Sequence, residues 1–480
     1  MATIVQSNMK FKGDVKLPSV NAPLPDGANL FADFSTGRYV IKHASGNVIR
    51  SAALTDILSF SCASVRSYVG SSGLIEYLQA NEPAIEYHPL SLECLGLRTE
   101  YSSTNRLAWS QDFSQSATWS SGGLALTPGD STAPDGNTTA TRLAETANGT
   151  STVRTLLAAT TSDAVAGSPY TFSIFAKANT AGVIQLAAQG ALAATAFANF
   201  DLKNGKIGKV SPGSATVGML QVTMEPYRNG WYRLSITITP ASAASPLFTI
   251  ALVNDDSSAT AVPSYLPSTP KSLWVWGAQA ERRDGYSSYI PTAGTEVMRA
   301  SEVCTTPSTT AFITSAAATV LVSVVHPHSL QSLSGKYNSL ACAVVLDNSA
   351  SGAHIRFAYR PPASGTAVGT PQGAAVGVIP DSSGTAQNLE IPGMAAVRDS
   401  EQSCIFNFDG AALTTRLFDG YSWYSRSVTA FPPTLSRLCI GRSNMDANNY
   451  FNGHIRKIIY WPTALGKVRI SRSFLPKLTR

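Results

Sequence analysis

Paired acidic side chains come first among residues that could do chemistry, because hydrolysis of a glycosidic bond needs two carboxyl groups about 5–9 Å apart. Asp255 and Asp256 are adjacent, so in a strand they would point to opposite faces, and turn residues are the favoured interpretation. The catalytic motifs GxSxG and HExxH and the phosphate-binding loop are absent from the sequence. The sequence therefore predicts a protein that is not an enzyme and has no catalytic residues.

Metal binding is the second chemistry to consider. His326 and His328 could lie on one face of a strand, since side chains at i and i+2 share a face. The proline between them favours a strand end or a loop instead. Oxygen donors suited to Ca²⁺ also occur, and turn formation explains the same residues: Asp347, Asn348, Asp446, Asn448 and Asn449. We expect no metal and no cofactor, with His326 and His328 as the weak candidate ligands.

Sugar recognition is the third chemistry, and it needs aromatic faces beside hydrogen-bonding groups. The segment 421–424 follows Asp419 and Gly420, which indicate an exposed turn. Tyr421, Trp423 and Tyr424 are therefore the predicted glycan-binding residues. Three other tryptophans lie in strand-like patterns, where core positions are the favoured interpretation: Trp231, Trp274 and Trp276.

The composition indicates the elements that must position these side chains. The chain has 480 residues, enough for two to four domains. Charged residues make up only 14%, against roughly 25% in typical domains, and Ser, Thr, Gly and Ala are abundant. Sheets whose outer faces carry Ser and Thr have this composition, so the sequence predicts an all-β fold.

The charge, cysteine and hydropathy patterns bear on the partners and the compartment. The net charge is +6, and the basic segment 467–480 is interpreted as a solvated tail rather than a contact for nucleic acid or lipopolysaccharide phosphate. Six cysteines show no CxxC spacing, which fits neither a zinc motif nor a disulfide framework. No apolar run reaches the ~18 residues of a membrane span, and the start of the chain is not typical of a signal peptide. We expect a protein made in a reducing cytoplasm, without nucleic-acid binding or membrane insertion.

Alternating apolar and polar residues predict strands through the middle of the chain. Segments 170–176, 231–239 and 247–253 have this period of two, and turn signals such as Lys203-Asn-Gly205 and Arg228-Asn-Gly230 separate such segments. The spacing suits a jelly roll of seven or eight strands. Proline-rich residues 1–30 are expected to be an extended arm.

Two stretches, residues 81–113 and 274–292, resemble phrases that recur in virion fibre and tail proteins of tailed bacteriophages. The first stretch contains Asn81-Glu-Pro-Ala-Ile-Glu-Tyr87, Gly96-Leu97, Thr104-Asn105 and Trp109-Ser-Gln-Asp-Phe113. The second contains Trp274-Val-Trp-Gly-Ala-Gln-Ala280 and Ser288-Tyr-Ile-Pro-Thr292. In that family the two stretches enclose a carbohydrate-binding-like β-sandwich. This sequence departs from the family at Arg98-Thr99, where the usual phrase is apolar.

The C-terminal part resembles the closing strands of laminin-G-like, concanavalin-like domains. The matching phrases are Leu438-Cys-Ile-Gly441, Tyr450-Phe-Asn-Gly-His-Ile455, Ile458-Ile-Tyr-Trp461 and Leu465. The predicted organisation has five parts: an arm at 1–30, a virion-attachment region at 31–110, a carbohydrate-binding-like sandwich at 111–300, a linker at 301–318 and a laminin-G-like sandwich at 319–480.

These resemblances imply a structural component of a tailed-phage virion, a head or tail fibre or spike on the particle's exterior that adheres to host surface polysaccharide or lipopolysaccharide. They also imply a homotrimer whose N-terminal region docks on capsid, tail or portal proteins. No heptad stalk enforces trimerisation, so the contacts would come from the sandwiches or the arm. Two alternatives stay open: a decoration or tail-assembly protein without a ligand, and a glycan-degrading tailspike, although the repetitive register of a depolymerising β-helix is missing.

Overall fold

A computed structural model gives the arrangement of the chain. It describes residues 24–43, 45–51, 53–146, 155–159, 165–189, 194–213, 219–240, 246–267, 269–307, 313, 317–326, 341–348, 354–360, 374–380, 385–392, 400–419, 422–431, 435–442 and 450–466. These residues form 33 strands, two short 3-10 turns and no α-helix. The predicted all-β class is therefore confirmed. No helix in the described part of the chain is long and apolar enough to cross a membrane.

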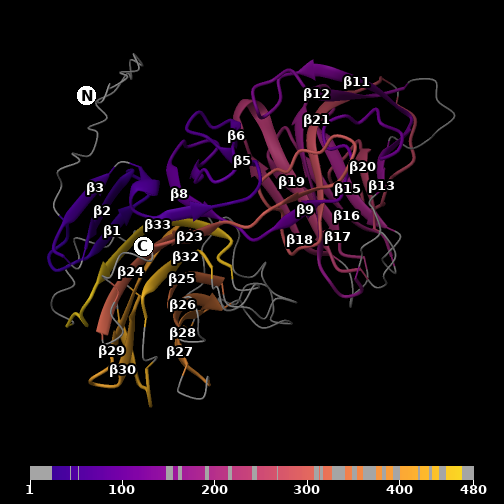
Figure 1. Ribbon diagram of the computed structural model, residues 1–480. Helices are drawn as coiled ribbons and strands as arrows, with labels where there is room; N and C mark the ends of the chain where they lie inside the picture. Colours follow the sequence, from indigo (N-terminus) through magenta and orange to yellow (C-terminus); the bar gives the residue numbers. More distant parts are fainter. Residues whose placement is uncertain are drawn as a thin grey trace, which may run out of the picture.

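Two six-stranded antiparallel sheets form a central β-sandwich (Figure 1). The first has, in spatial order, β10 (Trp119–Gly122), β13 (Thr155–Ala159), β20 (Leu247–Leu252), β15 (Val183–Gln189), β16 (Ala196–Asp201) and β17 (Lys206–Ser211). The second has β11 (Leu124–Ser131), β12 (Ala140–Glu145), β21 (Ser272–Glu281), β14 (Tyr170–Ala178), β19 (Trp231–Ile238) and β18 (Met219–Pro226).

Alternation along the strands explains the core of this sandwich. In β19, Leu234, Ile236 and Ile238 belong to the core between the sheets, while Arg233 and Ser235 lie on the other face. The hairpin between β18 and β19 turns at η2 (Arg228–Gly230), where Asn229 and Gly230 have φ values of 59° and 76°. Asn and Gly are the residues that accept this left-handed backbone, as the turn signal in the sequence indicates.

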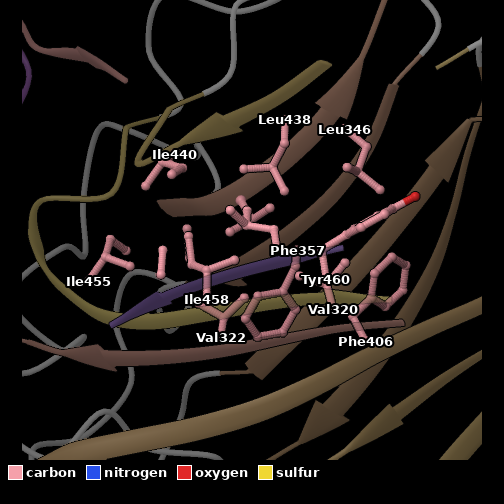
Figure 2. Packing of buried hydrophobic residues seen from close by; sticks show 14 of the residues in the cluster. Val320, Val322, Leu346, Phe357, Phe406, Leu438, Ile440, Ile455, Ile458 and Tyr460 are labelled. Atoms are coloured by element: carbon pink, nitrogen blue, oxygen red, sulfur yellow. The ribbon is translucent and has the colours of Figure 1, made fainter. Parts of the chain in front are cut away.

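A second sandwich contains most of the C-terminal strands. One sheet has the order β3 (Val48–Ser51), β2 (Arg38–Lys42), β1 (Leu30–Asp33), β33 (Gly453–Trp461), β24 (Ala317–Val325), β29 (Glu401–Asp409), β30 (Thr414–Phe418) and β31 (Trp423–Ser427). The facing sheet has β28 (Ala386–Pro392), β27 (Ala374–Pro380), β26 (His354–Arg360), β25 (Ala341–Asp347), β32 (Arg437–Ile440), β23 (Val303–Thr305) and β4 (Ser59–Ser61). Figure 2 shows their aliphatic and aromatic side chains meeting, among them Val320, Phe357, Phe406, Leu438 and Tyr460.

Strands from the N-terminal part complete this second sandwich. β1 lies between β2 and β33, with Leu30 opposite Tyr460 and Ala32 opposite Ile458. β8 (Cys94–Thr99) also pairs with β33, and β7 (Ile85–Tyr87) pairs with β8. The range 31–110 thus supplies strands to the sheets of the range 319–480, and the range 301–318 contains β23. The five-part division of the chain stays a prediction.

Two small two-stranded sheets contain the chain segments that connect the sandwiches. β5 (Arg66–Val69) pairs with β6 (Ile75–Leu78), and β9 (Ser103–Asn105) pairs with β22 (Val297–Arg299). Figure 1 shows β5 and β6 between the two sandwiches, on the side of β18 and β19. The segment 54–69, which the sequence allows as a short helix followed by a strand, contains the 3-10 turn η1 (Leu54–Asp56), β4 and β5.

Candidate functional site

A pocket of about 340 Å³ lies where these connecting strands meet both sandwiches. Residues from β5, β7 and β8 form one wall, and residues from β18, β19 and the loop after β21 form another. Its lining is rich in tyrosine: Tyr68, Tyr87, Tyr227, Tyr286 and Tyr289. Its charged or titratable lining groups are Glu86, His88, Arg98, Glu225, Arg233 and His454.

An aromatic cluster adjoins the pocket. β5 and β6 place Val69 and Ile75 against the outer face of the second central sheet, where Phe175, Trp231 and Trp276 are buried. The Phe175 ring lies edge-on to Trp276, with centroids 5.4 Å apart. The cluster continues into the pocket, because Val69, Ile75, Tyr227 and Tyr289 belong to both, and aromatic pairs add to the stabilisation from burial.

The two stretches that resemble phage proteins pack directly on each other beside this cluster. Asn105 Nδ2 donates to the Ile290 carbonyl at 2.9 Å, and Ser110 Oγ lies 2.7 Å from the Tyr289 hydroxyl. The Thr292 amide donates to Ser110 Oγ at 2.8 Å. The residues that the resemblance singles out therefore have a structural task, which is to close the central sandwich at its junction with the N-terminal strands.

Glu86, His454 and Arg98 form a buried group in the pocket wall. His454 Nε2 lies 2.6 Å from Glu86 Oε2, and Arg98 Nη1 lies 3.4 Å from the same oxygen. The Val69 amide donates to Glu86 Oε1 at 3.0 Å. Burial alone would raise the pKa of Glu86, but Arg98, His454 and the Val69 amide together lower it. Glu86 is therefore an ionised carboxylate whose oxygens are both occupied.

His454 fits the neutral form with a proton on Nε2. Burial lowers its pKa, against the opposing effect of the Glu86 carboxylate. An Nε2–H can donate to Glu86, which leaves Nδ1 as a hydrogen-bond acceptor. That Nδ1 is buried and has no hydrogen-bond partner among the residues that the structure describes. The imidazole thus has one unused acceptor in the wall of the pocket.

Ion pairs continue from Arg98 through the interior. Arg98 pairs with Glu100 at 2.5 Å, Glu100 with Arg299 at 3.3 Å, and Arg299 with Glu302 at 3.4 Å. Glu302 ends the series in a 2.5 Å pair with Arg66. Three arginines thus balance three glutamates, Glu86 included. Burial opposes the ionisation of Glu100, but Arg299, Arg98 and Arg283 hold its pKa well below the usual range.

Arg233 differs from the other buried arginines of the site. It is 3% exposed and lies over two rings, 4.0 Å from the centroid of Tyr286 and 5.2 Å from that of Phe175. Its Nη2 donates to Ser173 Oγ at 3.1 Å. Tyr227 is its other side-chain hydrogen-bond partner, and within the described ranges no ion pair joins Arg233 to a carboxylate. The pocket therefore contains a cation with donors to spare.

The predicted glycan residues lie elsewhere, on an edge strand of the second sandwich. Trp423 stacks on Phe418 with centroids 5.0 Å apart, while Tyr424 packs against the core between the sheets. Successive residues of β31 point to opposite faces, so Trp423 and Tyr424 do not form one platform. Tyr421 lies outside the described residues. Trp231 and Trp276 are buried as expected, and Trp274 is partly exposed with its Nε1 donating to Asp130.

The candidate metal ligands are also placed by the structure. His326 is buried between Tyr359 and Phe451, with ring centroids 4.8 and 4.9 Å away, and burial lowers its pKa to about 3. His328 lies outside the described residues. In the parts of the chain that the structure describes, no group of three or more His, Cys, Asp or Glu side chains could hold a metal ion.

The acidic candidates have ordinary structural partners. Asp347 is buried and pairs with Arg437, its two oxygens 2.8 and 2.9 Å from Nε and Nη2. Asp255 accepts from the Ser257 amide, as turn residues do, and Asp256 pairs with Lys206 at 2.8 Å. Residues 443–449, which include the other oxygen donors, lie outside the described residues.

Sequence reasoning did not single out the pocket. Arg233 and His454 lie within segments predicted as strands, and nothing in their spacing along the sequence links them to Glu86. One signal was present: Arg98 stands where the resembling phage phrase is apolar, and a charge at such a position needs a buried partner. The structure supplies Glu86 and Glu100 as those partners.

No protein-family model and no curated protein matches the chain. Among solved structures, the chain is similar to the CBM40 module of Ruminococcus gnavus IT-sialidase bound to alpha2,3 sialyllactose, at 12% identity and a TM-score of 0.25 over 32% of this chain and 78% of that one. It is also similar to domains LG4-5 of the mouse laminin alpha1 chain, at 8% identity and a TM-score of 0.20 over 80% and 94% of the two chains. Likenesses of this size carry no argument about a ligand. The β-sandwich fold rests on the strand pairing described above.

Proposed function

We propose that this chain is a non-catalytic saccharide-binding protein that mediates adhesion from the exterior of a tailed-phage virion. The observation that carries the binding proposal is the tyrosine-rich pocket of about 340 Å³ between the central sandwich and the N-terminal strands. Ligand pockets for small molecules have volumes of roughly 300–1,000 Å³ and combine apolar faces with a few placed polar groups. Tyrosine supplies an aromatic face and a hydroxyl together.

Binding is favoured over catalysis by the state of Glu86. Glu86 and Glu225 both line the pocket, and a glycosidase requires two carboxyl groups. Both oxygens of Glu86, however, accept hydrogen bonds from His454, Arg98 and the Val69 amide, and its pKa is lowered. A general acid needs a raised pKa, and a nucleophile or base needs a free carboxylate oxygen, so Glu86 suits neither role.

The virion part of the proposal is supported by the two phage-like stretches and their mutual packing at the junction. In this proposal an N-terminal segment docks on capsid or tail proteins, three chains assemble, and the sandwiches face the host surface. Several weak pockets on one particle would then raise avidity without tight binding at any single pocket.

A polysaccharide microarray tests the binding proposal. The labelled full chain is expected to bind a subset of bacterial surface polysaccharides, and Tyr68→Ala, in the pocket, is expected to weaken that binding about tenfold. Trp423→Ala is the matched aromatic control on β31. Loss of binding in Trp423→Ala with full binding in Tyr68→Ala would move the site to β31. Release of reducing sugar during the incubation would make the protein an enzyme.

Electron cryo-microscopy of the particle that carries the protein tests the virion proposal. We expect density for three chains that project from a capsid or tail socket. Monomers lying flat on the capsid lattice would support a decoration protein instead.

A further inference from the structure

The charges around the pocket indicate which chemical class of saccharide it would bind. Arg66, Arg98 and Arg299 are buried arginines, and each has a carboxylate within 3.4 Å. Arg233 is equally buried, yet its side-chain hydrogen bonds in the described structure go to the neutral hydroxyls of Ser173 and Tyr227. A guanidinium has five N–H donors, and a buried charge without a counter-ion is costly.

Neither neighbouring carboxylate of the described residues forms an ion pair with Arg233. Glu86 is occupied by Arg98 and His454, as described above. Glu225 stands directly opposite Arg233 in the register of β18 and β19 and lines the same pocket, but no ion pair joins the two in the described ranges. The rings of Tyr286 and Phe175 hold the guanidinium over their faces and restrict its orientation.

We propose that the pocket takes a saccharide that carries a carboxylate, such as a uronic acid, and that Arg233 binds this carboxylate. The planar guanidinium matches a carboxylate with two parallel hydrogen bonds, and the interaction gains strength away from water. The tyrosines provide faces and hydroxyl groups for the sugar ring. This inference rests on the proposed saccharide binding and specifies its chemical class.

A ligand series on the unaltered full chain tests the charge requirement. Isothermal titration calorimetry compares a galacturonic acid trisaccharide, its methyl ester and the corresponding galactose trisaccharide, which have matched ring sizes. We expect the acid to bind about tenfold more tightly than the ester and the neutral sugar, since only the acid can pair with Arg233.

Variants of Arg233 test the residue. Arg233→Met is expected to reduce acid binding to the level of the ester, and Arg233→Lys to give an intermediate affinity because it keeps the charge but loses the fork. Arg50→Met is the matched control, since Arg50 is exposed on β3. Near-ultraviolet circular dichroism reports whether each variant is folded. If Arg233→Met fails to fold, the ligand series on the unaltered chain still tests whether binding requires a carboxylate.

The outcomes separate this inference from the proposed function. Equal affinity for the acid, the ester and the neutral sugar would overturn the carboxylate requirement and leave saccharide binding standing. No binding of any saccharide, in the series or on the array, would overturn both. Binding of a peptide with a free C-terminal carboxylate in place of every sugar would also overturn both.

Discussion

His454 Nε2 and Glu86 Oε2 lie 2.6 Å apart although 368 residues separate them in the sequence. Glu86 lies on β7, before the central sandwich, and His454 lies on β33, near the end of the second sandwich. This contact, together with the pairing of β8 with β33, fixes the N-terminal strands to the C-terminal sheet at the wall of the pocket.

Removing the charge of Glu86 should destabilise the protein. Glu86→Gln leaves Arg98 with one carboxylate fewer in the interior, and breaking a buried ion pair typically costs about 3–5 kcal/mol. Glu93→Gln is the matched control, because Glu93 is more than half exposed and pairs with Arg456 at the surface, where an ion pair is worth about 1 kcal/mol or less. Urea unfolding measures both. An equal decrease in the unfolding free energy of the two variants would show that the buried Glu86 contact stabilises the protein no more than the surface pair does.

Stability should fall as the pH falls below neutrality. Burial lowers the pKa of His326 to about 3 and also lowers the pKa of His454. The unfolded chain therefore takes up protons at both positions below about pH 6.5, whereas the folded chain does not. Each histidine then costs about 1.4 kcal/mol of unfolding free energy per pH unit below that value, down to its folded pKa.

His326→Phe tests this pH dependence, because phenylalanine suits the aromatic surroundings and does not titrate. We expect the slope of the unfolding free energy between about pH 6 and about pH 5 to fall by about 1 kcal/mol per pH unit, which is the contribution of His326. His43→Gln, on the turn after β2, is the control and should keep the original slope. An unchanged slope in His326→Phe would mean that His326 is not the group that titrates.

Gly96 should be essential for the contact between β8 and β33. Its φ is +110°, and a Cβ at this position would collide with the Ile455 carbonyl oxygen. Gly96→Ala is expected to cost more than about 3 kcal/mol, since backbone atoms must move. Gly46→Ala is the control: its φ is +87°, but nothing lies within 4 Å of the added Cβ. There the backbone strain alone should cost about 1–2 kcal/mol. Thermal unfolding of both variants checks the difference.

The C-terminal sandwich should require the N-terminal strands. A fragment of residues 111–480 lacks β1, β4 and β8, which exposes one edge of β33 and one edge of β23. We expect this fragment to aggregate or to lose the cooperative unfolding of the full chain. The fragment 24–480 restores the three strands and serves as the control. Cooperative unfolding of 111–480 at the same temperature as 24–480 would contradict the prediction.

The sequence by itself determined the local structure. Low charge, period-two alternation in strands such as Tyr170–Ala178 and the Asn229-Gly230 turn are short-range properties, so an all-β sandwich could be predicted from them. The resemblance to phage phrases also marked Asn105 and Ser110, which contact Ile290 and Tyr289 of the second stretch in the structure. The predicted glycan contacts Trp423 and Tyr424 lie on opposite faces of β31, and their role in binding stays a prediction.

Only the tertiary structure decided the site. Arg233, Glu86 and His454 come from three strands in three parts of the chain. They line one pocket because β8 pairs with β33, β7 pairs with β8, and β5 covers the outer face of the central sheet. Strand pairing over such separations depends on which edges and faces remain to be covered, and a local pattern does not contain that information. The sequence therefore determines which charged residues the chain has, and the fold determines which of them line the pocket together.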